Sequence, residues 1–141
     1  MKIYTSYHAR AEKLIALGIQ PISISVQWPK YSKVRYPEMK NLAPTYKMLK
    51  MSEEQYDKHM NIILAGLDPR VVFQVINRNA QGKDVALLCY EADVNTCHRQ
   101  KVGEWLSRRL NILVEEYELP IVESKAMKVK KLKRTQQTLK F

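Results

Sequence analysis

The feature that most constrains the fold is an unbroken apolar run, Val85-Ala86-Leu87-Leu88-Cys89, which directly follows a turn sequence at residues 81–83. Continuous hydrophobicity over this length is typical of a strand that is covered on both faces, as the central strands of parallel sheets are. Parallel neighbours must be joined by crossover connections, which are usually helices. The run therefore predicts an α/β domain built around a buried central strand.

The rest of the chain shows alternating strand and helix patterns. Further strands are predicted at residues 2–7, 21–26 and 112–117, where β-branched, aromatic and alternating apolar residues gather. Helices are predicted at residues 9–17, 52–67 and 96–110, and a fourth begins at Pro69. We expect a three-layer α/β sandwich with a small, mainly parallel sheet and right-handed crossovers.

Local signals mark the helix ends. Gly18 stands where a helix C-terminal cap belongs. Ser52 and Gln55 form a capping box, in which each side chain is expected to bond the other residue's amide. Pro69 suits the first turn of its helix. Asn95 or Thr96 is expected to cap the last helix.

Length and charge suggest one domain and a tail. The 141 residues fit a single domain, which we place at residues 1–124 and follow by a basic tail at residues 125–141. The net charge is +10, but the tail holds seven lysine and arginine residues and no acid, which leaves residues 1–124 at +3. Such a tail attracts polyanions or simply keeps the chain solvated, and both interpretations stay open.

The cellular location is expected to be the cytoplasm. The sequence begins with strand-like residues rather than a signal-peptide hydrophobic block, and no apolar run approaches the ~20 residues of a membrane helix. We therefore expect a soluble protein with no membrane partner. Its two cysteines, Cys89 and Cys97, are expected to be thiols rather than a structural bridge.

Reactive and aromatic side chains follow each predicted strand. In open parallel sheets, ligands bind beyond the carboxyl ends of the strands, so these side chains are expected to converge on one edge. After the expected strands come Ser6, Tyr7 and His8, then Trp28, then Cys89, Tyr90 and Glu91, and the last helix opens with Cys97, His98 and Arg99.

The segment from Cys89 to Arg99 has four chemical interpretations. First, Arg99 and the amides of a helix N-terminus could hold a phosphate or carboxylate. Second, the same field could make Cys97 a thiolate nucleophile, with His98 adjacent. Neighbours in a helix point about 100° apart, so His98 is not automatically the base for that thiol.

The other two interpretations are a metal site and a structural role. Zinc could be held by Cys89, Cys97, His98 and His8, which are the right ligand types, although their spacing matches no compact zinc signature. In the structural interpretation, Cys89 fills the core as a small hydrophobe and Arg99 pairs with Glu91.

Spacing excludes several known site types. A thiol phosphatase needs an arginine six residues after its cysteine, and here Asn95 and Gly103 occupy those positions. The four glycines stand alone, so neither a P-loop nor the dinucleotide-binding G-x-G-x-x-G pattern is present. The paired motifs of zinc deaminases are also missing.

Several blocks of the sequence together resemble the domain of unknown function 488 family, from about Ile3 to Glu116. The most specific block runs from Ala86-Leu87-Leu88-Cys89-Tyr90-Glu91 to Cys97-His98-Arg99 and Trp105-Leu106, and the supporting blocks are Tyr4-Thr5-Ser6-Tyr7, Pro21-Ile22-Ser23-Ile24-Ser25 and Leu42-Ala43-Pro44-x-Tyr46. Family members tend to have a lysine where this chain has Ala92. The resemblance implies a Rossmann-like α/β fold with a pocket around the Cys-His-Arg block, and it implies no particular reaction.

The sequence supports two candidate functions. The first is binding, or acting on, a phosphorylated ligand such as a nucleotide or a nucleic-acid end. The candidate catalytic residues are then Cys97, His98, Glu91 and Cys89, and the candidate ligand-binding residues are Arg99, Ser6, Tyr7, Trp28 and Tyr46. The second is non-catalytic nucleic-acid binding through the basic tail and through aromatic and basic residues at 28–36. Neither function calls for a cofactor or a metal, and the oligomeric state is left open.

Overall fold

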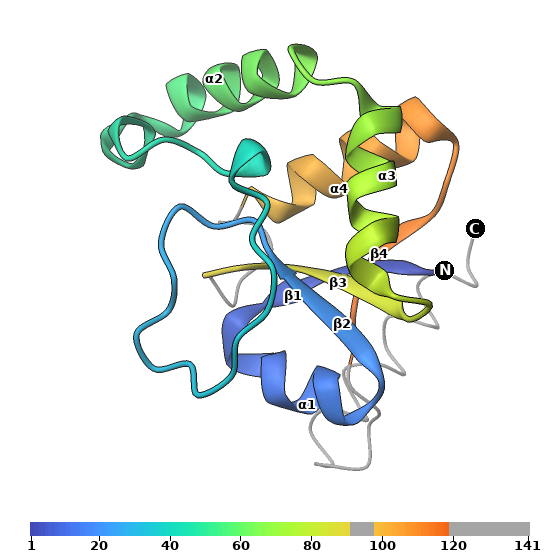
Figure 1. The fold of residues 1–141 in the computed structure, drawn as a ribbon. Coiled ribbons are helices and arrows are strands. Elements are labelled where there is room, and N and C mark those ends of the chain that lie inside the picture. Colours follow the sequence, from blue (N-terminus) through green and yellow to red (C-terminus); the bar gives the residue numbers. More distant parts are fainter. Residues whose placement is uncertain (91–97, 119–141) are drawn as a thin grey trace, which may run out of the picture.

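The computed structural model describes residues 1–90 and 98–118 of the chain (Figure 1). The apolar run lies in strand β3 (Asp84–Cys89), and residues 85–89 are all buried. β3 is flanked by a strand on each side and covered on both faces, as the run predicts. The central position of β3 therefore confirms the main expectation from the sequence.

The described sheet has four strands in the order β2-β3-β1-β4, and all neighbouring strands are parallel. The other strands are β1 (Ile3–Tyr7), β2 (Ile19–Ser23) and β4 (Val114–Glu116). β1 and β3 pair from Ile3 with Val85 to Tyr7 with Cys89. The carboxyl ends of these two central strands therefore lie side by side.

Helices cover both faces of the sheet. The helices are α1 (Ala11–Ala16), α2 (Glu53–Ala65), α3 (Pro69–Ala80) and α4 (Arg99–Leu110). Figure 1 shows α1 on one face, α3 and α4 on the other, and α2 beyond them. The protein is thus a three-layer α/β sandwich of Rossmann-like type, as expected.

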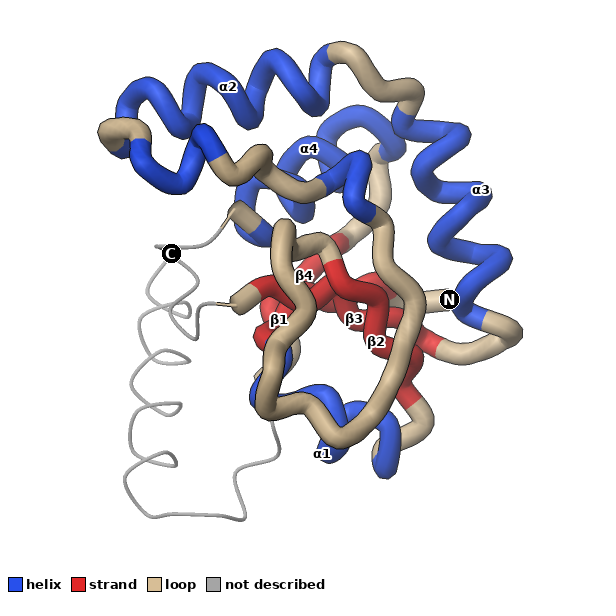
Figure 2. The backbone as a smooth tube through the Cα atoms, turned by 60° about the vertical axis from the view of Figure 1, so that its left-hand side comes forward, coloured by secondary structure: helices blue, strands red, loops and turns tan. Residues whose placement is uncertain are grey.

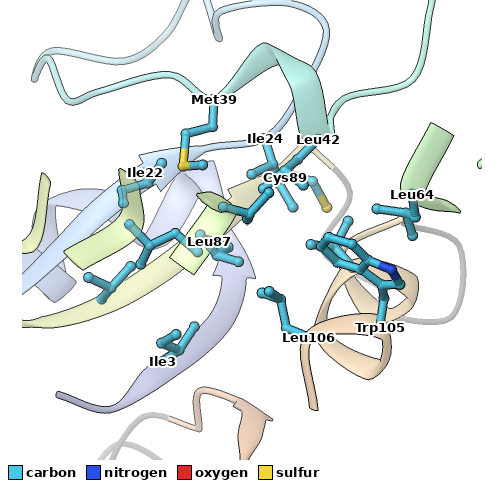
Figure 3. Close-up of a cluster of buried hydrophobic side chains, with 14 of the residues drawn as sticks. Ile3, Ile22, Ile24, Met39, Leu42, Leu64, Leu87, Cys89, Trp105 and Leu106 are labelled. Atoms are coloured by element: carbon cyan, nitrogen blue, oxygen red, sulfur yellow. The ribbon is translucent and has the colours of Figure 1, made fainter. Parts of the chain in front are cut away.

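Two apolar clusters hold these layers together. The larger one joins Ile3, Leu87 and Cys89 of the sheet to Trp105 and Leu106 of α4 (Figure 3). The smaller one joins the other face of the sheet to α1, with fully buried Leu14 and Leu88 at its centre. Alternate residues of β3 face the two clusters, because successive side chains of a strand point to opposite faces.

The signals expected at the helix ends are largely confirmed. Asp68 Oδ1 accepts a hydrogen bond from the Arg70 amide, and Pro69 is the first residue of α3. Gly18 follows α1 with a φ of +78°, which favours glycine. Of the two bonds expected for the capping box, the structure shows one, from the Gln55 amide to Ser52 Oγ.

Two expected elements differ from the prediction by three residues at one end. The predicted strand at 21–26 forms β2 only to Ser23, although the Ile24 amide still bonds the Leu88 carbonyl before the chain turns away. The helix expected from residue 96 begins at Arg99, with His98 as its N-cap. The expected caps at 95 and 96 lie outside the described residues.

Part of the segment between β2 and α2 pairs with the sheet and packs into the core. Its Glu38 forms a parallel bridge with Ser23, and Met39, Leu42 and Met48 are buried in the core. In Figure 2 it crosses in front of the sheet before it reaches α2. The segment therefore forms one wall of the carboxyl edge.

α4 lies unusually close to the sheet because of a glycine. A Cβ atom on Gly103 would lie 3.2 Å from Val114 Cγ1 and 3.4 Å from Thr5 Cγ2. This close approach fixes the start of α4 against β1 and β4. No helix within residues 1–90 and 98–118 is long and apolar enough to cross a membrane. The expected basic tail lies outside the described residues.

Candidate functional site

The site lies where the connections of the sheet diverge. From β1 the chain crosses over β3 to reach β2, whereas from β3 it crosses β1 to reach β4. In open α/β sheets such a switch point is the usual position of a ligand crevice. A cavity of about 800 Å³ opens there, and its lining includes Ser25, Cys89, Tyr90, His98, Gln100 and Lys101. We call it the edge cavity.

His98 forms part of the inner wall of the edge cavity. Its Nε2 donates a hydrogen bond to the Ile24 carbonyl over 2.5 Å, and a carbonyl can only accept. Burial lowers the pKa of His98 to about 4, and the nearby Arg99 charge acts in the same direction. At neutral pH the ring is therefore uncharged and ties α4 to the segment after β2.

Arg99 is fully buried and held by an acid from β4. Its Nε and Nη2 each donate to one carboxylate oxygen of Glu116, both over 2.9 Å. Thr5 Oγ1 donates to the same carboxylate over 2.7 Å. The third guanidinium nitrogen donates to Cys89 Sγ over 3.0 Å. The two parallel bonds to one carboxylate are the strongest geometry available to an arginine.

Because of this pairing, Arg99 is not placed to hold a phosphate or carboxylate, which was the first interpretation of the sequence. The side chain is absent from the lining of the edge cavity, and its charge is balanced by Glu116. Glu91, the partner expected in the structural interpretation, lies outside the described residues. Arg99 instead fixes the start of α4 to the end of the sheet.

Cys89 is disulfide-bonded in this structure. The expectation that this cysteine is a free thiol is therefore wrong for this structure. The sequence has one other cysteine, Cys97, which lies outside the described residues. Cys89 is buried in the core and also belongs to the lining of the edge cavity.

A second buried histidine, His8, orders the polar residues next to the cavity. Its Nδ1 lies 2.6 Å from the Tyr36 hydroxyl, and its Nε2 lies 2.8 Å from Ser25 Oγ. Ser25 in turn donates to the Gln27 carbonyl over 2.7 Å. Burial lowers the pKa of His8 to about 4, so the ring is neutral at physiological pH.

These contacts assign the proton of His8. Because the Ser25 hydroxyl gives its proton to a carbonyl, Ser25 Oγ must accept from His8 Nε2–H. His8 Nδ1 is then unprotonated and accepts from the Tyr36 hydroxyl. The chain Tyr36–His8–Ser25–Gln27 is fully satisfied, so it holds Ser25 in place at the cavity wall.

Aromatic residues gather beside this chain. Trp28 packs against Tyr36 with ring centroids 4.6 Å apart, and Arg35 lies over the Trp28 ring. Tyr90 contacts His8 edge-on at 5.9 Å and Tyr31 at 6.0 Å. Tyr90 is 42% exposed and lines the edge cavity, so it offers an aromatic face to a ligand there.

The other predicted ligand-binding residues do not line the edge cavity. Ser6 is fully buried, and its hydroxyl has no hydrogen-bond partner within residues 1–90 and 98–118. Tyr7 is half-buried beneath the guanidinium of Arg10, at 4.7 Å from its ring centroid. Trp28 belongs to the aromatic group above, and Tyr46 is 58% exposed. Of the predicted catalytic residues, Cys89 and His98 line the cavity, and Glu91 and Cys97 lie outside the described residues.

The edge cavity has the start of α4 at one wall, where the described residues supply no side-chain cap, and carboxylates at another. His98 makes no side-chain cap bond, and the amides of Gln100 and Lys101 have no partner within the described part of the chain. Glu53 and Asp57 line the cavity from α2, and Lys101 Nζ lies 3.6 Å from Asp57 Oδ1. The cavity can therefore accept an anionic group at α4 and donor groups at α2.

Zinc was one interpretation of the sequence. Among residues 1–90 and 98–118, no group of three or more histidine, cysteine, aspartate or glutamate side chains is placed to hold a metal ion. The nitrogen atoms of His8 bond Tyr36 and Ser25, so this predicted ligand is engaged elsewhere.

Sequence reasoning missed several residues of the site. Ser25, Gln27 and Tyr56 line the edge cavity, and Gln100 and Lys101 do so from α4. The two serines around Ile24 carried the only signal for this part of the site: small polar residues where a strand should bury apolar ones. Ser23 Oγ lies 3.2 Å from Ser25 Oγ, and Ser25 accepts from His8.

The fold and the site define a Rossmann-like α/β protein with a cavity at the carboxyl edge of its parallel sheet. The family model DUF488-N3a, described as the active DUF488-N3 subclade, matches residues 22–110, which is more than half of the chain. The chain therefore belongs to the DUF488 family. No curated protein and no solved structure matches it.

Proposed function

We propose that this protein binds a nucleotide or the end of a nucleic acid in the edge cavity. One observation carries the proposal: the first turn of α4, which receives no side-chain cap from the described residues, lines a cavity that also presents the exposed ring of Tyr90. Unpaired helix amides with the positive end of the helix dipole suit a phosphate. An aromatic face suits a base.

The phosphate would contact the amides of Gln100 and Lys101 and the Lys101 ammonium. Arg99 takes no direct part in this proposal, because Glu116 already occupies its guanidinium. The carboxylates of Glu53 and Asp57 on the α2 wall would accept hydrogen bonds from amino groups of the base. The ligand would thus lie with its phosphate toward α4 and its base toward Tyr90 and α2.

Cys89 and His98 are the candidates to act on the bound ligand, because both line the inner end of the cavity. A nucleophilic Cys89 would require the reduced chain, since the sulfur is disulfide-bonded in this structure. Cys97 and Glu91 remain candidates on the sequence alone. The description of the matching family as an active subclade supports a chemical role. We place this function in the cytoplasm.

The alternative is non-catalytic nucleic-acid binding by the tail and the surface. Within the aromatic and basic segment at 28–36, Trp28 and Tyr36 pack against His8, and Tyr31 is the largely exposed ring. That packing favours a role for the segment in supporting the edge cavity. Deletion of residues 125–141 separates the two ideas, because only the alternative predicts that most binding is lost with the tail.

The test compares two tyrosines. Nucleoside 5′-monophosphates are titrated into the full chain by calorimetry, with Tyr90→Ala and Tyr46→Ala as variants. Loss of one stacked base costs ~1–3 kcal/mol, so Tyr90→Ala should bind at least about fivefold more weakly. Tyr46→Ala, an exposed tyrosine outside the cavity lining, should bind as the unmodified chain does. No binding by any nucleotide, or equal affinity of the two variants, would overturn the proposal.

A further inference from the structure

A second concave site lies further along α4, next to the edge cavity. It has a volume of about 410 Å³ and is lined by α2 and α4, with Lys101, Trp105, Arg108 and Arg109 among its residues. We call these four residues the α4 patch. Lys101 and Glu104 line both cavities, so the two sites adjoin each other along the helix.

The arginines of the α4 patch are available to a ligand. Both are exposed, and neither makes an ion pair or a side-chain hydrogen bond in the described part of the chain. The carboxylate of Glu104 in the same lining already accepts from Gln100 over 3.4 Å. Lys101 is paired with Asp57 over 3.6 Å, so Arg108 and Arg109 face this site with the single acid Glu104, which leaves it with a positive charge.

Trp105 supplies a second and independent observation. Trp105 is 6% exposed, and its buried Nε1 has no hydrogen-bond partner among the residues that the structure describes. In Figure 3 this nitrogen lies on the side of the ring away from Ile24 and Cys89. A buried N–H without a partner costs about 1–3 kcal/mol, so an acceptor at this site would recover that energy.

The spacing of the patch follows one face of the helix. Residues 101, 105 and 108 stand at i, i+4 and i+7, which share a face, and Arg109 is one turn beyond Trp105. Seven residues of helix rise about 10 Å. That length corresponds to about three nucleotides at the ~3.4 Å rise of one stacked strand.

We propose that the α4 patch binds backbone phosphates of a single nucleic-acid strand whose end lies in the edge cavity. The inference rests on the proposed function and narrows its substrate class, from any nucleotide to a polynucleotide end. Arg108 and Arg109 contact successive phosphates, and Trp105 Nε1–H donates to a phosphate oxygen. A mononucleotide occupies only the edge cavity and does not contact the α4 patch.

The test measures binding of a 5′-phosphorylated single-stranded octanucleotide by fluorescence anisotropy at several salt concentrations, and of a nucleoside monophosphate by calorimetry. The full chain is compared with Arg108→Gln/Arg109→Gln, with Trp105→Phe, and with Arg70→Gln/Arg78→Gln. The last variant removes the same charge from exposed positions on α3 and is the matched control.

The expected results differ between the two ligands. Loss of two phosphate contacts should lower the salt slope of octanucleotide binding by about 1.4 and the affinity by on the order of tenfold at 0.1 M salt. Mononucleotide affinity should not change, and the α3 control should behave as the unmodified chain. Trp105→Phe should weaken octanucleotide binding without changing the salt slope by more than about half a unit.

Three outcomes would overturn the inference, and they are distinguishable. Equal effects of the α4 and α3 double variants would mean that only total charge matters. If the full chain bound the two ligands with equal affinity, the α4 patch would not bind a nucleic-acid strand. The edge cavity would still be a nucleotide site. If the full chain bound neither ligand, the proposed nucleotide-binding function would be wrong as well.

Discussion

Arg99, which is fully buried, holds Glu116 through two parallel hydrogen bonds of 2.9 Å that join the start of α4 to the end of β4. The same guanidinium reaches Cys89 Sγ, so one side chain connects three elements at the carboxyl edge. A buried charge requires a partner, and a bidentate carboxylate is the most complete one available. The edge cavity therefore depends on an ion pair that does not itself line it.

We expect Glu116→Gln to destabilise the fold by about 3 kcal/mol, because the buried Arg99 charge would lose its partner. Urea unfolding followed by circular dichroism measures the change. Glu115→Gln, which changes the exposed neighbouring acid, is the control and should stay within about 0.5 kcal/mol of the unmodified chain. Equal stability of the two variants would show that the pair does not secure α4.

Acid should destabilise the protein between about pH 6.5 and pH 4. His8 and His98 have folded-state pKa values lowered to about 4 by burial, against an ordinary value of 6.5. Between these values the unfolded chain binds more protons than the folded one, so stability falls as the pH falls. Each histidine contributes a loss on the order of 3 kcal/mol across this range.

Urea midpoints at pH 7.5, 5.5 and 4.5 test the histidine effect. His59, which is exposed on α2, provides the matched control. His59→Gln should keep the full pH dependence, whereas His8→Gln should show a shallower one. A pH dependence that is unaltered in His8→Gln would argue against a buried neutral ring at that position.

Tyr36→Phe should destabilise the fold by about 1–3 kcal/mol, because His8 Nδ1 would lose its donor inside the core. Thermal unfolding measures the effect. Tyr4→Phe removes a hydroxyl that makes no hydrogen bond in the described structure and should have little effect. If both variants were equally stable, the assigned proton arrangement of His8 would be incorrect.

Glu104→Gln should strengthen the binding of phosphorylated ligands, because this acid lines both the edge cavity and the α4 patch. Removal of one like charge near a phosphate is worth a few tenths to about 1 kcal/mol, or up to about fivefold in affinity. Glu12→Gln on α1 changes the same charge elsewhere and should leave affinity unaltered. Weaker binding by Glu104→Gln would contradict an anionic ligand at α4.

The fold could be predicted largely from local sequence signals. The apolar run of β3 indicated a central parallel strand, and Asp68-Pro69 marked the start of α3. The first residue of α4 could not be predicted. His98 is the N-cap because of its position in the fold, and it makes no side-chain cap bond that a sequence pattern could indicate.

The site could be predicted only in part, for a physical reason. The position of Cys89 and His98 after the predicted strands indicated that both lie at the carboxyl edge of the sheet. It could not show that Glu116, in a short edge strand, would take up Arg99, because that contact depends on the packing of α4 across β1. The link from His8 to Ser25 likewise joins two strand ends that only the sheet order brings together.

The most direct measurement of the central claim is an NMR titration of the ¹⁵N-labelled full chain with a nucleoside 5′-monophosphate. The account predicts saturable shifts of the amides of Tyr90, Gln100 and Lys101, with the Tyr46 amide unchanged. Shifts confined to other parts of the chain, or no saturable shift at these three amides, would contradict a nucleotide site in the edge cavity.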